Sequence, residues 1–352
     1  MRAGKDERTF LPVSCLEFCP RGEMVLGVVL GEGWFAWDLK TNEKQPLLFK
    51  SNLSGQGTLS GTGKLISRDR KWLIEPTLQE WREWIDRENR PLRPRKDHSL
   101  AWIQVWDFEK RTPKHEHVMP VKHITAARLG HHADHIIIAG SDDIVRVVDF
   151  HSGKTVQQFT MPNRTGEYSS PDLIRSINIS TDGKRCVATS LERIRLWDLE
   201  KQKAIVLEPR PPDGQKRYRN PLFGGAQITP DGKWVVALLT EVWNESGRPG
   251  HEFSVDIWNA ATGKFYGGTA ALDDETLPII VHPDSRHVFM RCSRDPKSIV
   301  CWDVIKKAKV AKWTFRENIG SWALSPDGTQ IITSHGVNLQ LWRVQLDDAP
   351  ER

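Results

Sequence analysis

Cysteine is scarce in this chain, and the few cysteines have no paired spacing. Five occur among 352 residues, an odd number, without the spacing that disulfide frameworks or zinc ribbons use. Cys15 and Cys19 are four residues apart on one face of a predicted strand, and the others fall in separate predicted strands at Cys186, Cys292 and Cys301. We interpret all five as reduced core thiols, which predicts a cytoplasmic protein.

Long apolar runs are also missing. No segment approaches the roughly 20 apolar residues that cross a bilayer, and the first eight residues contain no apolar core of a signal peptide. The net charge of +5 comes from 50 basic and 45 acidic side chains. A bias this mild does not by itself indicate a nucleic-acid partner. We therefore expect no membrane span, and bulk charge selects no partner class.

Catalytic motifs are missing as well. We find no glycine-rich phosphate loop after a strand, no His-Glu-x-x-His and no nucleophile elbow. Six histidines lie close together in the sequence: His115, His117, His123, His131, His132 and His135. His115 and His117 are two residues apart and therefore share one face of a predicted outer strand. No cysteine or carboxylate completes a set of metal ligands with them. We expect solvated turn and edge histidines, no catalytic residue, no metal and no cofactor, and hence no enzyme.

What the chain has instead is a repeated unit, clearest from Ser180 to Leu199. An Asp-Gly turn joins two apolar runs, and a third run ends in Trp-Asp; Asp-Gly between such runs favours a tight hairpin. The third run recurs seven times and ends at Trp37, Trp106, Val148, Trp197, Trp258, Trp302 and Trp342. Two undisturbed spacings, Trp106 to Val148 and Trp302 to Trp342, are 42 and 40 residues. These match the roughly 40–45 residues of a four-stranded propeller blade.

On these residues the chain resembles the WD-repeat β-propeller family over nearly its whole length, with divergent repeats similar to those of bacterial members. It departs from the family in lacking the Gly-His dipeptide before the first strand, so we do not carry over the family's buried His–Asp network. The resemblance implies an all-β fold, a seven-bladed β-propeller of four-stranded antiparallel blades. It also implies a platform for protein–protein interaction.

We expect the whole chain, 1–352, to form this single propeller. The predicted blades span approximately 13–50, 51–120, 121–162, 163–208, 209–268, 269–313 and 314–347. A strand at 7–12 is predicted to close the ring against the last blade, because closure removes exposed sheet edges. The alternative outer strand of blade seven is 344–347, which Asp347, Asp348 and Pro350 disfavour.

Four segments interrupt the regular period. An insertion lies between the second and third strands of blade two, with a predicted short helix at 77–89 that Thr77 caps and Pro91 ends. A loop at 243–250 interrupts blade five, and long linkers at 162–171 and 209–221 precede blades four and five. Connections of these two kinds leave a blade on the same face. We therefore expect one insertion-bearing rim, the face on which repeat proteins often bind partners.

The residues that we select as candidates for partner binding are aromatic or basic and fall on this rim: Trp84, Arg90, Arg93, Arg95, Lys96, Tyr168, Arg210, Lys216, Arg217, Tyr218, Arg219, Trp243 and Arg248. Tryptophan and arginine are enriched among interface hot spots. For the predicted helix two interpretations stay open. It packs Leu78, Trp81 and Ile85 back onto the propeller, or it presents Trp84 to a partner.

These residues predict a non-enzymatic scaffold, a subunit or adaptor of a larger complex, that docks proteins or peptides with an acidic surface favoured. The alternative is a propeller that binds RNA, another nucleic acid or phosphate through its basic loops. Only Tyr218 in those basic loops offers base stacking, and the blade-five insertion is locally acidic. A third interpretation, an enzyme with a site in the central channel, would be favoured by stoichiometric metal.

Overall fold

The computed structural model describes residues 13–29, 33–46, 66–67, 71–76, 101–110, 112–130, 134–161, 173–208, 210, 222–245, 248–269, 276–292, 295–336 and 338–346. Within these ranges the secondary structure is entirely strand and turn, with no helix. The strands form seven antiparallel sheets that follow one another along the chain. The fold is thus an all-β seven-bladed propeller of four-stranded antiparallel blades, as the repeat period predicts.

The first four blades take up the first half of the chain. Blade one contains β1 (Val13–Phe18), β2 (Met24–Val29), β3 (Gly33–Asp38) and β4 (Lys44–Pro46). Blade two contains β5 (Trp72–Pro76), β6 (Trp102–Asp107) and β7 (Thr112–Val118), and an isolated bridge from Ile66 to Leu73 marks its first strand position. Blade three contains β8 (Ile124–Leu129), β9 (His135–Gly140), β10 (Ile144–Asp149) and β11 (Thr155–Thr160). Blade four contains β12 (Ser176–Ile179), β13 (Arg185–Thr189), β14 (Ile194–Asp198) and β15 (Lys203–Ile205).

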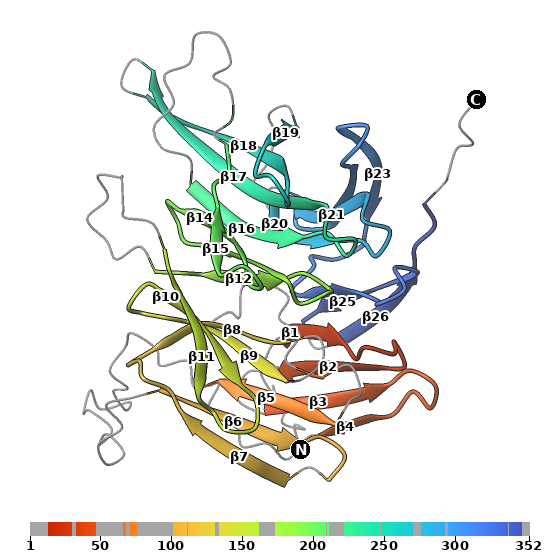
Figure 1. The fold of residues 1–352 in the computed structure, drawn as a ribbon. Helices are drawn as coiled ribbons and strands as arrows, with labels where there is room; N and C mark the ends of the chain where they lie inside the picture. Colours follow the sequence, from red (N-terminus) through yellow and green to blue (C-terminus); the bar gives the residue numbers. More distant parts are fainter. Residues whose placement is uncertain are drawn as a thin grey trace, which may run out of the picture.

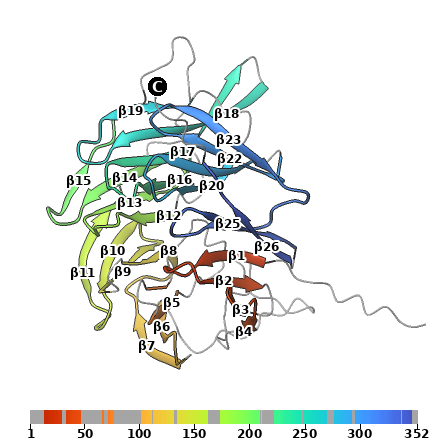
Figure 2. The same cartoon turned by 90° about the vertical axis from the view of Figure 1, so that its right-hand side faces the viewer.

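The remaining blades follow in the same order (Figures 1 and 2). Blade five contains β16 (Leu222–Ile228), β17 (Trp234–Glu245), β18 (Arg248–Asn259) and β19 (Phe265–Gly268). Blade six contains β20 (Thr276–Val281), β21 (His287–Cys292), β22 (Ser298–Asp303) and β23 (Ala308–Thr314). Blade seven contains β24 (Trp322–Leu324), β25 (Gln330–His335) and β26 (Asn338–Arg343).

Apolar clusters between neighbouring blades hold the ring together. In β9, Ile136 and Ile138 pack toward blade two while Ile137 packs toward blade four, because successive side chains of a strand point to opposite faces. All three are fully buried, so a blade strand reads as a continuous apolar run. Further clusters join blades four to five, five to six, six to seven and seven to one. The last of these closes the ring, and the N–H of Val13 donates to the Gly336 carbonyl 3.2 Å away.

The outer position of blade seven is only partly described. The predicted closing strand at 7–12 lies outside the described residues. Of the alternative, Val344, Gln345 and Leu346 form no strand, and this interpretation is wrong for these residues. Instead the N–H of Val344 donates to Thr329, and Val344 and Leu346 pack against the cluster between blades six and seven.

The carboxylates after the repeated tryptophans are architectural, as their period predicts. Asp38 accepts hydrogen bonds from the N–H groups of Lys40 and Thr41, at 2.8 and 3.0 Å. The same bond, to the N–H group two or three residues on, recurs at Asp107, Asp149, Asp198, Asn259 and Asp303. Each side chain therefore closes the turn between the third and fourth strands of its blade.

A second carboxylate closes the turn between the first and second strands. In blade four the Ser180 hydroxyl donates to Asp182 at 2.6 Å, and in blade seven Ser325 donates to Asp327 at the same distance. Burial raises the pKa of Asp182, but the hydrogen bonds from the Ser180 hydroxyl and from the Lys184 N–H outweigh burial. The pKa of Asp182 therefore lies below 3.8. The Ser325 hydrogen bond is the largest cause of the lowered pKa of Asp327. The hydroxyl and the carboxylate satisfy each other without any further ligand.

These lowered pKa values predict a loss of stability in acid. Groups whose pKa is lower in the folded state stabilise the fold above their unfolded pKa and lose that contribution as the pH falls. We expect the contribution of these aspartates to the free energy of unfolding to be constant between about pH 7 and 5 and to fall below about pH 4, as measured by urea unfolding. In an Asp327→Asn variant, which keeps the acceptor oxygen but cannot titrate, proton uptake on acid unfolding should fall by up to about one proton. If proton uptake in this variant equals that of the wild type, the lowered pKa of Asp327 does not contribute to the loss of stability in acid.

Two features differ from what the sequence predicts. The repeated tryptophans are buried or half-buried, except that Trp342 is 38 % exposed, because β26 has no outer neighbour among the described strands. The segment 243–250 is no loop, since most of it continues β17 and β18. The predicted helix at 77–89 lies outside the described residues. Burial of the described cysteines is confirmed, and it raises the pKa of Cys186 and Cys301 to about 12.

Candidate functional sites on the two rims

Strand order places all four interruptions of the period at one rim. Two are connections between second and third strands, β5 to β6 and β17 to β18, and two are connections between blades, β11 to β12 and β15 to β16. In an antiparallel four-stranded blade these connections leave the same end of the sheet. The other end, the turn rim, carries short turns such as 181–184 and 199–202. The topology therefore supports the insertion-bearing rim that the sequence predicts.

The feature that the structure adds at this rim is a long hairpin. β17 and β18 pair over twelve residues each, from Trp234 opposite Asn259 to Glu245 opposite Arg248. The inner neighbour β16 reaches only Thr240, and the outer neighbour β19 pairs only with Asp256 to Trp258. The tip is thus a two-stranded ribbon that projects beyond the blade at the upper left of Figure 1. Among the described strands, neither of its edges is paired.

A conflict of signals explains why the sequence predicts a loop here. Pro249 removes a ladder donor, and glycines at 247 and 250 favour turns. On both sides, however, the runs are rich in β-branched and aromatic residues, and only positions 246 and 247 separate β17 from β18. A two-residue connection of this kind is the common hairpin turn. The cross-strand pairing of these runs outweighs the local turn signals.

Most of the predicted partner-binding residues lie outside the described residues: Trp84, Arg90, Arg93, Arg95, Lys96, Tyr168, Lys216, Arg217, Tyr218 and Arg219. Trp243 and Arg248 lie in the ribbon, where Trp243 is opposite Gly250 in the register. They are the two predicted site residues that fall within β17 and β18. Their role in binding stays a prediction.

Arg210 is the one predicted site residue whose contacts are described. Its guanidinium donates to the hydroxyl of Ser254 at 2.9 Å, to the carbonyl of Thr269 at 3.1 Å and to the carboxylate of Asp256 at 3.3 Å. Asp256 is fully buried, so the arginine neutralises a core carboxylate and ties the linker to blade five. Its charge is therefore directed into the blade.

A second arginine, this one buried, joins two blades at the same rim. Arg193, in the turn between β13 and β14, donates to both oxygens of Asp143, in the turn between β9 and β10, at 2.9 and 3.1 Å. Its Nε also donates to Ser190 at 3.2 Å. The Arg193 side chain is 4 % exposed. Arg193 and Arg210 are thus both used within the propeller.

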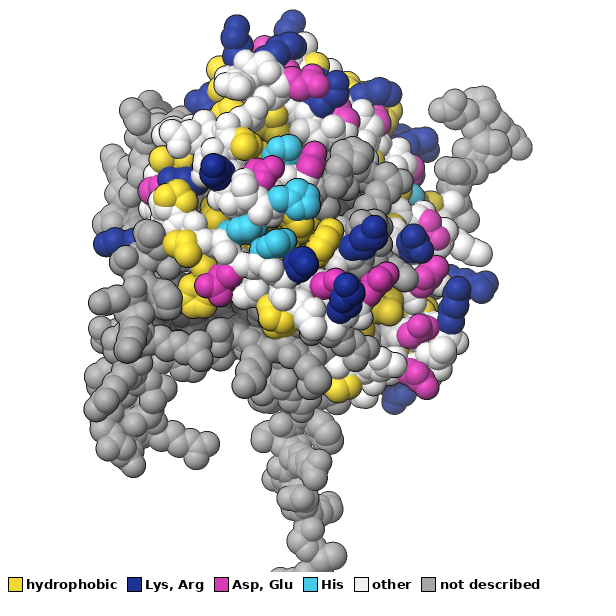
Figure 3. Space-filling model, turned by 60° about the horizontal axis from the view of Figure 1, so that its bottom comes forward, with side chains coloured by type: hydrophobic (Ala, Val, Ile, Leu, Met, Phe, Trp, Pro, Cys, Tyr) yellow, Lys and Arg dark blue, Asp and Glu magenta, His cyan; other side chains and the backbone are white. Residues whose placement is uncertain are grey.

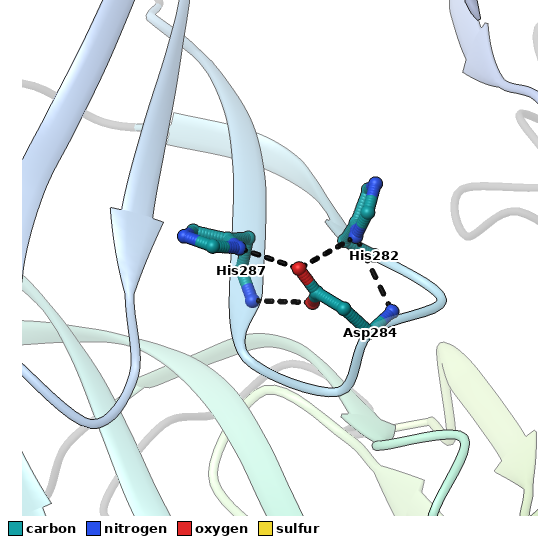
Figure 4. Close-up of side chains that lie close together, drawn as sticks. All are labelled: His282, Asp284 and His287. Carbon is teal, nitrogen blue, oxygen red and sulfur yellow. Dashed lines mark hydrogen bonds and ion pairs between the residues drawn. The ribbon is translucent and has the colours of Figure 1, made fainter. Parts of the chain in front are cut away.

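On the turn rim, blade six holds a group that the sequence analysis missed (Figure 4). His282 directly follows β20, Asp284 stands in the turn and His287 begins β21. Both Nδ1 atoms approach one carboxylate oxygen, Asp284 Oδ2, that of His282 at 3.0 Å and that of His287 at 2.6 Å. Asp284 Oδ1 accepts from the N–H groups of Arg286 and His287, which fixes the carboxylate in place.

The surroundings of this group are charged and well ordered by hydrogen bonds. Asp303 Oδ2 lies 4.0 Å from Nε2 of His287 and accepts from Arg286 Nε at 2.8 Å. Burial raises the pKa of Asp284, but hydrogen bonds with His282 and His287 and from the backbone outweigh it, and the pKa lies well below the usual range. The carboxylate is therefore ionised at neutral pH.

The sequence signal was hidden by the repeat. His282-Pro283-Asp284-Ser285 occupies the register of Ser325-Pro326-Asp327-Gly328, so in the sequence it counts as one more turn of the repeat. Two histidines distinguish this turn from the other turns of the repeat: one at its first position and one five residues later. Within the described residues, this is the one set of three or more histidine, cysteine or carboxylate side chains close enough to hold a metal ion.

One member of the predicted histidine cluster, His117, has a structural role. His115 and His117 lie on β7, an outer strand, with stacked rings 5.8 Å apart. His117 is buried rather than solvated, and its Nε2 bonds to the Phe150 carbonyl of blade three at 2.8 Å. Burial is the largest cause that lowers the pKa of His115. On the face drawn in Figure 3, basic and acidic side chains of the described residues are interspersed, with histidines near the middle.

None of the described residues forms a helix long and apolar enough to span a membrane. No model of a known protein family matches this chain, and no curated protein matches it either.

Proposed function

We propose that this chain is a non-enzymatic scaffold, a WD-repeat-type propeller that docks protein partners on its insertion-bearing rim as a subunit or adaptor of a larger complex. The observation that carries the proposal is the ribbon formed by the outer parts of β17 and β18. A two-stranded ribbon is only marginally stable in water, and unpaired strand edges are templates for another chain. A segment of this kind is best explained if a partner covers it.

The contrast between the two rims supports the same proposal. The turns of the turn rim are short and closed by their own carboxylates, as at Asp182 and Asp198. The insertion-bearing rim carries all four interruptions of the period, and loops on one face of a repeat protein often form its binding surface. Arg210 and Arg193 are neutralised within the propeller, which favours a protein surface over nucleic acid.

The projecting part of the hairpin can be deleted without removing a strand of the blade. Thr240 lies opposite Phe253 in the register, so removing 241–252 and joining these residues by Asn-Gly leaves a blade of ordinary size with a favourable two-residue turn. We would purify the tagged chain and this variant from the source cell, and quantify the co-purifying proteins by mass spectrometry. We expect the partner to be lost from the shortened variant, because its docking ribbon is gone.

Two further variants make the result specific. One reverses Arg93, Arg95, Arg217 and Arg219 to Glu in the basic segments of the insertion-bearing rim. The matched control reverses four exposed lysines at the turns between third and fourth strands of the turn rim: Lys154, Lys203, Lys264 and Lys306. Loss of the partner in the rim variants alone supports the proposal. Nuclease-sensitive nucleic acid lost on charge reversal supports the alternative, and a partner retained in all variants contradicts the choice of rim.

A further inference from the structure

The group at the turn of blade six departs from the other turns in one chemical respect. In blades four, five and seven the first turn position carries a hydroxyl, Ser180, Thr229 or Ser325, which donates to the turn carboxylate at 2.6 Å. Blade six keeps the backbone bonds of the same turn. The hydroxyl donor, however, is replaced by the ring of His282. The self-satisfied pair of the other turns is therefore missing.

The contacts of His282 determine which ring nitrogen carries its hydrogen. Nε2 lies 3.3 Å from the carbonyl of Gly328, which can only accept, and Nδ1 accepts from the N–H of Asp284 at 3.2 Å. The neutral ring therefore has its hydrogen on Nε2 and a lone pair on Nδ1. That lone pair lies 3.0 Å from a carboxylate oxygen, which is also an acceptor. Two such atoms at this distance require a proton or a metal cation between them.

His287 supplies a third donor atom to the same point. Its Nδ1 is 2.6 Å from Asp284 Oδ2, and its Nε2 faces the carboxylate of Asp303. At 2.6 Å from an ionised carboxylate, Nδ1 carries the hydrogen in the metal-free protein, and a metal ion that displaces this proton leaves the hydrogen on Nε2, which faces Asp303. A carbonyl behind one histidine and a carboxylate behind the other form the outer shell that orients metal-binding imidazoles.

We propose that His282 Nδ1, His287 Nδ1 and Asp284 Oδ2 form a binding site for a divalent transition metal, Zn²⁺. Two imidazoles and one carboxylate suit zinc, whereas calcium and magnesium prefer oxygen ligands alone. Asp284 is 36 % exposed, while the histidine side chains are 12 % and 8 % exposed. The set is therefore closed on the protein side and open to water at a fourth position.

The geometry requires only a small adjustment. Ligand atoms about 2.0–2.1 Å from a tetrahedral zinc are roughly 3.3 Å from each other, and the three donor atoms lie within 4.8 Å of one another. The 2.6 Å contact between His287 Nδ1 and Asp284 Oδ2 has to lengthen by about 0.7 Å for both atoms to bind one zinc ion. The metal replaces the proton between His287 and Asp284, and it ties the blade-six turn to Gly328 of blade seven through His282. The site lies at a turn on the rim, which assigns it to binding and stabilisation.

The test compares the chelator-treated full chain with a variant built from the protein's own turns. His282→Ser and His287→Gln together reproduce the residues of blade seven, Ser325 and Gln330, so this double variant should fold. By isothermal titration calorimetry with zinc chloride at pH 7.5, we expect one Zn²⁺ per wild-type chain. We expect affinity to fall about 100-fold or more in the double variant. Magnesium chloride should give no binding to either chain.

A His115→Ala variant controls for zinc held by other surface imidazoles and should bind as the wild type does. X-ray absorption of the zinc-loaded wild type gives a readout that needs no variant, and it should report two imidazole nitrogens with oxygen ligands. The proposal is overturned if the wild type takes up no zinc, if the double variant binds it as tightly, or if the zinc has sulfur ligands.

Discussion

Replacing Trp197 with alanine is expected to lower the free energy of unfolding by about 3–5 kcal/mol, the usual cost of removing a large buried aromatic side chain. Trp197 is 2 % exposed and lies in the apolar cluster between blades three and four. Its ring packs on Phe159 of the neighbouring blade, with the centroids 5.7 Å apart. Truncation leaves a cavity at a blade interface, where both faces of the sheet are already packed. Urea unfolding followed by circular dichroism measures the loss.

The matched control is the same residue type at the same repeat position of the last blade. Trp342 is 38 % exposed, although it contacts Phe315 and donates to Thr333 at 2.9 Å. Because part of its surface already faces water, Trp342→Ala should cost about half as much as Trp197→Ala. Equal losses at the two positions would show that blade seven is covered in solution as fully as blade four is.

A loss of about 3 kcal/mol is expected when Asp143 is replaced by asparagine, because the buried guanidinium of Arg193 then lacks its counter-charge. Asp143 has a positive φ of 62°, a conformation that asparagine also tolerates. The substitution therefore removes the charge without straining the backbone. Since Asp143 is itself 35 % exposed, the expected loss lies at the lower end of the range for buried pairs.

Arg193→Met provides the other half of a double-mutant cycle. It removes the buried charge and leaves an aspartate that water can solvate, so it should cost less than Asp143→Asn. The double variant should recover part of the Asp143→Asn loss, because no unpaired charge remains between blades three and four. Strictly additive losses, or a loss under about 1 kcal/mol in Asp143→Asn, would mean that the pair does not couple the two blades.

The features that could be predicted from the sequence are those whose causes are local. An Asp-Gly turn and a Trp-Asp strand end are specified within a few residues, since the hydrogen bonds of Asp182 and Asp198 reach only two to three residues along the chain. Repeated every 40 residues or so, they determine the number of blades. They also determine which connections share a rim, because strand order within an antiparallel blade leaves no choice.

The ribbon at β17 and β18 could be predicted from the sequence only in part. Its strands are specified by β-rich runs, and its turn by two residues, but local turn signals from Pro249 and its neighbours point the other way. Cross-strand pairing over twelve residues decided the conflict. The turn preference of single residues does not include the stabilisation that paired side chains on two neighbouring strands contribute together.

The roles of particular charged and titratable side chains depended on the tertiary structure alone. Arg193 is 50 residues from Asp143, and Arg210 is 46 residues from Asp256; no local pattern links them. The ring of His282 is oriented by a carbonyl 46 residues away, in another blade. The repeat by itself determined the scaffold, because its contacts are local and periodic. The choice of partner for a buried charge, and the point at which three ligand atoms converge, required neighbouring blades to be packed side by side.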